Sequence, residues 1–288
     1  MTKAKTKRTD DGQKTEKKKT IPLKEVDITR IPTYIEGYDS HLDGGIPTGH
    51  VVLVSGTAGT MKSSVVFNIF YNEVLNNKAT AVYLSLEQSS RSLLTHLVNM
   101  GYDLTKIPLE LMDDISKLGD TLKRVKNSKE GMLVFIDVGA VRKELKAVTN
   151  SPSGDWINVL KNILKKFRTQ AAIDLFCVDS LSALYVLSEM KNPRTELFHI
   201  FEFLRDSEVT SFLISEMPLD KNKLSEYEIE DFLADSVIML ELKPRQRRVM
   251  REISTVKMRS TNANTDIFTL EFEKGKFKAL HGGQTPLV

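Results

Sequence analysis

Short apolar runs alternate with segments of helical periodicity along most of the chain from Ile31 onward. The runs are charge-poor and end at polar residues, as strands buried on both faces do. Such alternation is typical of a mostly parallel sheet with helices on its faces. The expected strands are Val51 to Val54, Ala81 to Leu86, Met132 to Val138, Leu175 to Val178 and Ser211 to Ser215.

The segments between these runs carry apolar residues at helical spacing. Leu197, Phe201 and Leu204 recur at spacings of four and three, which places them on one helix face. Gly101 suits the position after a helix end, and Asp155 suits an N-cap. The expected helices are Lys62 to Leu75, Ser90 to Met100, Trp156 to Phe167 and Pro193 to Arg205.

The pattern changes after Asp235, where β-rich runs follow one another with no room for helices between them. These runs predict an antiparallel extension of the sheet and comprise Val237 to Leu242, Ile253 to Met258 and Ile267 to Phe272. Lys243 to Arg251 holds five basic residues and a proline, which favours an exposed loop. The sequence therefore predicts one α/β domain over residues 21–288.

Composition adds limits on the class of protein. A chain of 288 residues with 41% hydrophobic residues can bury a substantial core. Cys177 is the one cysteine, so the chain can form no internal disulfide and no cysteine-based zinc site. No apolar stretch is long enough for a membrane helix. These features favour a soluble, cytoplasmic protein without a membrane partner.

The positive charge is concentrated at the N-terminus. Residues 1–20 hold 8 lysines and arginines against 3 acidic residues, whereas the rest of the chain holds 33 against 35. This composition predicts a disordered basic tail over residues 1–20. Lys17, Lys18 and Lys19 could attract nucleic acid or an acidic partner, but a solvated end is the more favoured interpretation.

A glycine-containing segment, Ser55 to Ser64, lies directly between the first expected strand and the first expected helix. Glycine permits close backbone approach, and N–H groups of a loop and a helix start can converge on an anion. In the phosphate-loop pattern G-x-x-x-x-G-K-[ST], Lys62 would reach the β- and γ-phosphates and Ser63 would hold Mg²⁺. Met61 departs from that pattern, and an ordinary turn before a lysine remains the alternative.

Two carboxylates close other expected strands, at the edge where open α/β sheets bind ligands. Asp179 follows Leu175 to Val178 and could support a Mg²⁺ ion, or it could simply cap the next helix. Glu87 closes Ala81 to Leu86 and could orient a water for attack on the γ-phosphate, or it could be a solvated acid.

Several segments together resemble the KaiC-like branch of the RecA superfamily of ATPases, in its archaeal and bacterial single-domain form. Leu42 to Pro47 (LDGGIP) resembles the family's turn before the first core strand, and Gly56 to Ser63 resembles its phosphate loop. Leu175 to Leu184 (LFCVDSLSAL) is similar to the metal-binding strand. Glu230 to Ile238 (EDFLADSVI) and Glu252 to Thr261 (EISTVKMRST) resemble two later segments.

The resemblance implies a RecA-like P-loop ATPase core that binds ATP and Mg²⁺ in a homo-oligomeric ring, a hexamer in the family. It also implies that Lys257 and Arg259 act in catalysis on the nucleotide of a neighbouring subunit; from pattern alone they are cations on an exposed strand face. The nucleotide-binding residues implied are Gly56, Ala58, Gly59, Thr60, Met61, Lys62, Ser63, Ser64, Asn99, Lys257, Met258, Arg259 and Thr261.

The chain departs from the family pattern at Met61, Gln88 and Ser260, where glycine, glutamate and glycine are usual. The leading hypothesis is an ATPase in which Lys62 and Glu87 serve catalysis and Ser63 and Asp179 hold the metal. A nucleotide-sensing scaffold with little ATPase activity, regulating a protein partner, is the alternative. An accessory ATPase of DNA repair or recombination is a weaker one, suggested by the tail and the arginines of Lys243 to Arg251.

Overall fold

A computed structural model describes residues 27–137, 139, 156–188, 190–217, 224–245 and 247–281. The predicted tail at 1–20 and the predicted N-cap Asp155 lie outside these residues.

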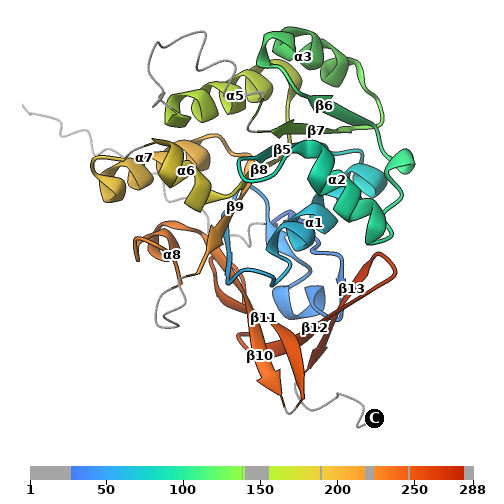
Figure 1. Ribbon diagram of the computed structural model, residues 1–288, viewed down its shortest axis with the longest axis vertical. Helices are drawn as coiled ribbons and strands as arrows, with labels where there is room; N and C mark the ends of the chain where they lie inside the picture. The colour runs from blue at the N-terminus through green and yellow to red at the C-terminus, as the bar shows by residue number, and fades with distance from the viewer. Residues whose placement is uncertain are drawn as a thin grey trace, which may run out of the picture.

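The described residues form an eleven-stranded sheet with the order β2-β13-β12-β11-β10-β4-β9-β8-β5-β7-β6 (Figure 1). Six consecutive strands of this sheet run parallel to one another, and five of them confirm the five expected strands. They are β4 (Val51–Gly56), β5 (Thr80–Ser85), β6 (Leu109–Met112), β7 (Met132–Asp137), β8 (Leu175–Asp179) and β9 (Thr210–Glu216). Strand β6 was not expected, because four residues at a sheet edge give little pattern to read.

The C-terminal part extends this sheet with antiparallel strands, as predicted. β10 joins them to the parallel part by pairing with β4. The strands are β10 (Ser236–Arg245), β11 (Arg248–Met258), β12 (Ile267–Glu273) and β13 (Lys276–His281). Near the N-terminal end of the described chain, β2 (Ile35–Glu36) pairs with β13, while β1 (Arg30–Ile31) and β3 (Ile46–Pro47) form a separate two-stranded sheet.

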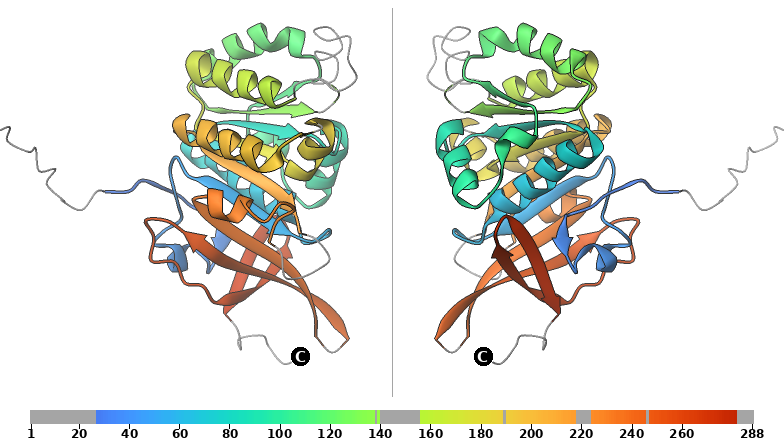
Figure 2. Two further views of the ribbon diagram at one scale, coloured as in Figure 1. Left: turned by 90° about the vertical axis from the view of Figure 1, so that its left-hand side faces the viewer. Right: turned by 90° about the vertical axis from the view of Figure 1, so that its right-hand side faces the viewer.

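The loop predicted over Lys243 to Arg251 is wrong, although the predicted exposure is confirmed for most of the described residues of this segment. These residues continue β10 and β11 as a long hairpin, in which Lys243 pairs with Met250 and Pro244 with Val249 (Figure 2). The pairing of β10 with β4 ends at Leu240, so beyond this residue that edge of β10 has no partner strand among the described residues, and Pro244, Arg245, Arg248 and Val249 are exposed. Basic side chains are compatible with such a ribbon, and proline is tolerated where a strand has a neighbour on one side alone.

Helices cover both faces of the parallel part of the sheet (Figures 1 and 2). All four expected helices are present, and α6, which was not expected, begins two residues after Asp179. The α-helices are α1 (Lys62–Asn77), α2 (Ser90–Asn99), α3 (Leu118–Asn127), α5 (Trp156–Ala171), α6 (Leu181–Ser188), α7 (Pro193–Asp206) and α8 (Glu230–Leu233). Short 3₁₀ turns occupy Asp39–Leu42, Leu104–Lys106 and Ile115–Lys117.

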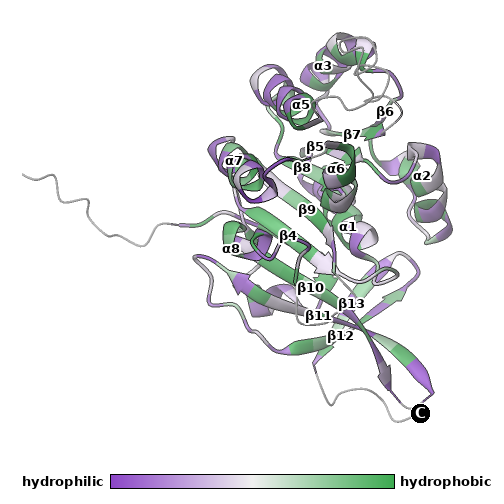
Figure 3. Cartoon of the chain, turned by 60° about the vertical axis from the view of Figure 1, so that its left-hand side comes forward, coloured by the Kyte–Doolittle hydropathy of each residue, from purple (hydrophilic) through white to green (hydrophobic). Residues whose placement is uncertain are grey.

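The sheet separates two hydrophobic clusters. Val52 and Val54 of β4 join the cluster under α1 and α2, whereas Val51 and Leu53 join the cluster under α5, α6 and α7. Alternate side chains of one strand therefore enter different cores, which explains the unbroken apolar runs in the sequence (Figure 3). Within the described ranges, no helix combines the length and hydrophobicity needed to cross a bilayer.

Candidate functional site

A cavity of about 450 Å³ lies at the carboxyl ends of β4, β5, β8 and β9, against the start of α1. It brings together most of the residues expected at the phosphate loop, together with both carboxylates expected at strand ends. Its lining comprises Ala58, Gly59, Met61, Lys62, Ser63, Ser64, Glu87, Gln88, Leu93, His96, Met100, Asp179, Glu216 and Arg251.

The loop between β4 and α1 has a glycine-like backbone at Met61, the position where the phosphate-loop pattern has glycine. Met61 adopts φ 74° and ψ 28°, in the left-handed region, and makes no side-chain capping hydrogen bond. A non-glycine residue in this conformation costs about 1 kcal/mol or more. Its side chain is partly buried and packs against the hydrophobic cluster below α1. Met61 therefore adopts the backbone conformation that glycine would favour here, and first-turn N–H groups of α1 can still bind an anion.

Lys62, the first residue of α1, points back into the loop. Its ammonium donates to the carbonyls of Gly56 (2.9 Å) and Thr57 (3.0 Å) and forms an ion pair with Glu216 (Nζ–Oε1 2.8 Å). The Lys62 side chain is 5% exposed. The cation is thus buried at the base of the cavity and fully hydrogen-bonded within the chain.

Asp179 ends β8 beside the start of α1 and is 6% exposed. Burial raises the pKa of its carboxyl, whereas hydrogen bonds from the hydroxyls of Tyr83 and Ser63 act in the opposite direction. The Tyr83 hydroxyl lies 2.6 Å from Asp179 Oδ2. The carboxylate is therefore held in one orientation beside Ser63, the other residue expected at a metal.

Glu87 lies just beyond β5 and is exposed. Its carboxylate accepts a hydrogen bond from the hydroxyl of Ser180. The neighbouring backbone N–H of Leu86 donates to the carbonyl of Asp179 at 2.6 Å, which ties the ends of β5 and β8 together. This arrangement places the Glu87 side chain at the cavity wall with an oxygen open to solvent.

Three of the expected nucleotide contacts near the loop lie outside the cavity wall. A Cβ on Gly56 would come within 2.3 Å of the Leu240 carbonyl, so only glycine fits there. The Thr60 hydroxyl donates to the Thr57 carbonyl at 2.8 Å and closes the loop on itself. Asn99 is exposed at the end of α2 and does not line the cavity.

Besides the lining residues Leu93, His96 and Met100, sequence reasoning missed Glu216, Arg251 and Tyr83 at this site. Glu216 closes β9 in the same way that Glu87 follows β5, so the rule of strand ends could have found it. Arg251 was assigned to a loop; from β11 it lines the cavity, and its Nε lies 3.4 Å from the Gly59 carbonyl. Tyr83 looked like an ordinary core residue, and only the three-dimensional contact with Asp179 reveals it.

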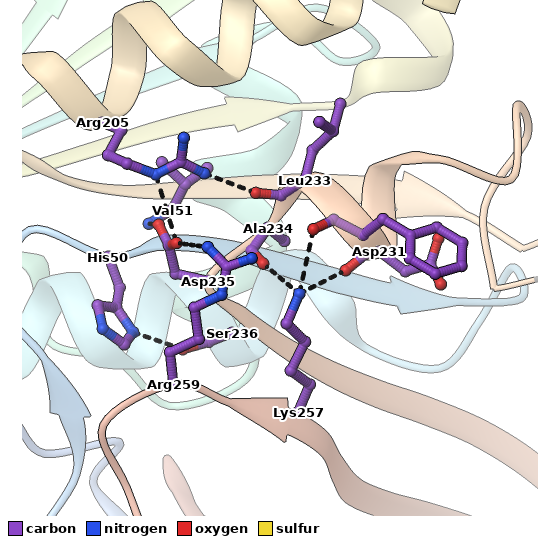
Figure 4. A network of polar contacts seen from close by, with 11 residues as sticks. His50, Val51, Arg205, Asp231, Leu233, Ala234, Asp235, Ser236, Lys257 and Arg259 are labelled. Atoms are coloured by element: carbon purple, nitrogen blue, oxygen red, sulfur yellow. Dashed lines mark hydrogen bonds and ion pairs between the residues drawn. The ribbon is translucent and has the colours of Figure 1, made fainter.

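Lys257 and Arg259 lie at the amino ends of the parallel strands, the edge of the sheet opposite the cavity. Figure 4 shows the polar contacts that they make there. The pairing of β10 with β11 and with β4 places them beside the first residues of β4, whereas the phosphate loop follows its last residue. Six residues of strand separate the two edges by roughly 15–20 Å. Within one chain these cations therefore do not reach the cavity.

A single carboxylate organises this opposite edge. Asp235 Oδ1 pairs with Arg259 (2.7 Å) and Arg205 (3.4 Å), while its Oδ2 accepts the N–H of Val51 (3.1 Å). The Asp235 side chain is 8% exposed, and the two arginines are about half exposed. The carboxylate thus links α7, β4 and β11 at one point.

Lys257 is held by backbone carbonyls beside that cluster. Its ammonium donates to the carbonyls of Asp231 (3.1 Å), Phe232 (3.2 Å) and Ala234 (2.8 Å). Burial and the charge of Arg259 lower the pKa of the Lys257 ammonium.

The two other residues expected near Lys257 have different surroundings. The Met258 side chain is 7% exposed and belongs to the hydrophobic core. The Thr261 hydroxyl accepts a hydrogen bond from Arg30 Nη1 at 2.8 Å.

Comparison with known proteins agrees with this architecture. A family model described as "ATPase: KaiC" matches residues 31–112 and 108–278. The circadian clock oscillator protein KaiC of Acaryochloris marina is 24% identical over 238 residues, which is 82% of this chain and 41% of that protein. KaiC3 of Synechocystis is 24% identical over 237 residues, with 82% of this chain and 42% of that protein covered.

The fold is shared with a smaller protein. The crystal structure of the KaiC-like protein PH0186 from Pyrococcus horikoshii matches with a TM-score of 0.66 and 21% identity, over 88% of this chain and 99% of that one. This chain spans about two fifths of the length of the curated clock proteins that it matches. The family model covers most of the described chain, and we conclude that the protein belongs to the KaiC ATPase family.

Proposed function

We propose that this protein binds Mg²⁺·ATP in the cavity at the phosphate loop and hydrolyses it in a ring of identical subunits. The observation that carries the proposal is the convergence of Lys62, Ser63, Asp179 and Glu87 on one cavity at the carboxyl edge of the sheet. Strands β4, β5 and β8 and helix α1 bring these residues together from distant parts of the sequence, as a nucleotide site in an open α/β sheet requires.

The donors and acceptors of the cavity fit a metal-bound triphosphate. Backbone N–H groups at the start of α1 and the Lys62 ammonium suit phosphate oxygens, while the Ser63 hydroxyl and Asp179 carboxylate suit Mg²⁺ and its water ligands. When bound, Mg²⁺ would neutralise charge on the β- and γ-phosphates. The hydrogen bond from Tyr83 would keep Asp179 oriented toward Ser63.

Glu87 would position the attacking water. Its carboxylate is exposed at the cavity wall, and its hydrogen bond from Ser180 fixes one oxygen while the other remains available. Phosphoryl transfer depends mainly on such positioning and on charge stabilisation. Gln88, which lines the same cavity, would contribute a neutral amide there.

Lys257 and Arg259 would act on the nucleotide of a neighbouring subunit. Their position at the opposite edge of the sheet excludes action on their own phosphate loop but suits a head-to-tail ring, where that edge of one copy faces the cavity of the next. A cation delivered in this way makes hydrolysis depend on assembly.

A nucleotide-sensing scaffold is the second candidate, and the side chain of Met61 favours it. A side chain at that position stands at the cavity wall where the phosphate-loop pattern has none. In a scaffold the site would bind ATP tightly and hydrolyse it slowly, and the bound state would regulate a protein partner.

Equilibrium binding of ATP with Mg²⁺, followed by single-turnover phosphate release from the assembled protein, tests both candidates. We expect Lys62→Ala to lose ATP binding, and Glu87→Gln to keep it while turnover falls about 100-fold. Lys78→Ala is a matched control, because Lys78 makes an exposed ion pair at the far end of α1. Failure of the unmodified protein to bind ATP would refute both candidates. Phosphate release no faster than that of Lys62→Ala would favour the scaffold.

A further inference from the structure

The ion pair between Lys62 and Glu216 is a feature that phosphate binding alone does not explain. An ammonium group has three protons to donate, and Lys62 has three acceptors: the carbonyls of Gly56 and Thr57 and the carboxylate of Glu216. Its hydrogen-bonding capacity is therefore filled before any nucleotide arrives. A phosphate oxygen can gain Lys62 only when one of these acceptors is released.

The three acceptors differ in how easily they can leave. The two carbonyls belong to the loop backbone, which the ammonium itself draws together. The Glu216 backbone is also fixed, because it pairs with Gly56 in the sheet and the next N–H, that of Met217, donates to the Gly56 carbonyl at 3.0 Å. The Glu216 side chain is 38% exposed and can rotate toward solvent without disturbing either strand.

Charge selects the same acceptor. A triphosphate beside Lys62 would stand next to the Glu216 carboxylate, and like charges this close repel each other strongly in a partly buried site. Neutral carbonyl dipoles would experience no such repulsion. Glu87 and Asp179 add two further carboxylates to the cavity wall, so that rotation of Glu216 toward solvent would reduce the negative charge that a triphosphate meets.

In the absence of nucleotide, Glu216 has the opposite effect. Lys62 is almost wholly buried, and a buried cation without a counterion is strongly destabilising. We propose that Glu216 is an internal counterion that stabilises the empty site and competes with the phosphates of ATP for Lys62. This inference rests on the proposed nucleotide site and adds a residue that sets its affinity.

The variant Glu216→Gln tests both effects of this carboxylate, because its loss should destabilise the empty protein and strengthen ATP binding. We expect the nucleotide-free variant to melt at a lower temperature and yet to bind Mg²⁺·ATP about tenfold more tightly than the unmodified protein. A role in packing alone would weaken both properties. AMP should bind both proteins equally, because the lysine of a phosphate loop contacts the β- and γ-phosphates.

Glu110→Gln is the matched control. Glu110 also pairs with a basic side chain, Arg124, but lies on β6, the outermost strand at one side of the sheet. We expect this change to leave ATP affinity unaltered. If Glu216→Gln does not fold, Glu216→Asp keeps the charge but withdraws it by one methylene, and we expect it to bind ATP about threefold more tightly.

The outcomes distinguish this inference from the proposed function. If the unmodified protein binds ATP and the variant binds it equally or more weakly, the counterion role is overturned and the nucleotide site stands. If neither protein binds ATP, both proposals are overturned. Tighter binding together with a lower melting temperature supports both.

Discussion

The two edges of the sheet each hold a lysine whose ammonium has three acceptors, but the acceptors differ. Lys62 at the carboxyl edge has a carboxylate among them, whereas Lys257 at the amino edge is bound by three neutral carbonyls. Among the described residues, one ammonium therefore has a carboxylate in direct contact, whereas the other makes its hydrogen bonds to neutral groups. Under the proposed function, the difference implies that the cavity would need a removable counterion, whereas the edge that would face a neighbouring subunit would keep its positive charge.

The surroundings of Lys257 increase this contrast. Arg205 and Arg259 share the single carboxylate of Asp235, so the cluster is richer in positive than in negative charge. Half of each arginine remains exposed. An edge of this kind can attract an anionic group on another molecule without first breaking an internal carboxylate pair at Lys257.

The largest expected effect comes from removing a cation at the amino edge. We expect Arg259→Ala to reduce steady-state phosphate release about 10³-fold, because a cation supplied to the transferring phosphate is lost. ATP affinity of the dissociated subunit should change little, because the cavity of the same chain lies at the other edge. Fluorescence titration and phosphate release measure the two quantities.

Mixing two inactive variants gives the sharper test of action between subunits. Lys62→Ala lacks a functional cavity and Arg259→Ala lacks the cation, so a mixed ring contains some interfaces with both residues intact. Partial recovery of phosphate release on mixing is expected. Arg168→Ala, which removes an exposed ion pair on α5, serves as the control. No recovery in rings shown by mass measurement to be mixed would mean that the cation acts within its own chain or not at all.

An intermediate effect is expected from Asp235→Asn. The amide can still accept the N–H of Val51, but the shared anion between Arg205 and Arg259 is lost. We expect the free energy of unfolding to fall by about 1–3 kcal/mol, a value reduced for the half-exposed arginines. Chemical denaturation measures it. Asp120→Asn, at an exposed ion pair on α3, should cost less than about 0.5 kcal/mol. Equal effects of the two changes would remove Asp235 from its organising role.

The sequence sufficed for the parallel core because burial on both faces leaves a strong and continuous signal. Val51 to Val54 and Leu175 to Val178 are apolar at every position, and each is followed by a polar residue, Ser55 or Asp179, of which Asp179 lines the cavity. Local chemistry also located Lys62, Ser63 and Asp179 correctly on this edge. The same rule would have reached Glu216, which ends β9 in the same way.

Other features depend on partners far away in sequence and could not be predicted in this way. The charged residues from Lys243 to Arg251 look like a loop, because nothing local reveals that Lys243, Arg245, Arg248 and Arg251 take part in strand pairing across a hairpin. Arg251 reaches the Gly59 carbonyl only as a result of that pairing. Tyr83 likewise becomes a hydrogen-bond partner of Asp179 because β5 pairs with β8 in the sheet.

The smallest expected effect is a pH dependence confined to the amino edge. His50 hydrogen-bonds Ser236 at 2.8 Å, and burial lowers the pKa of its ring; the arginines lower it further, while Asp235 opposes them. The folded protein therefore favours the neutral His50 ring. The stability that this preference adds is fully present above about pH 6.5, the approximate pKa of the ring in the unfolded chain. It is lost as the pH falls through the lower pKa of the ring in the folded protein. Thermal melting between pH 7.5 and 5 should show a loss in the unmodified protein that exceeds that of His50→Gln by about one or two degrees. Asp235→Asn should steepen the loss, because it removes the one charge that opposes the arginines. An identical pH profile for all three proteins would mean that the amino edge does not carry the excess positive charge that distinguishes it from the cavity.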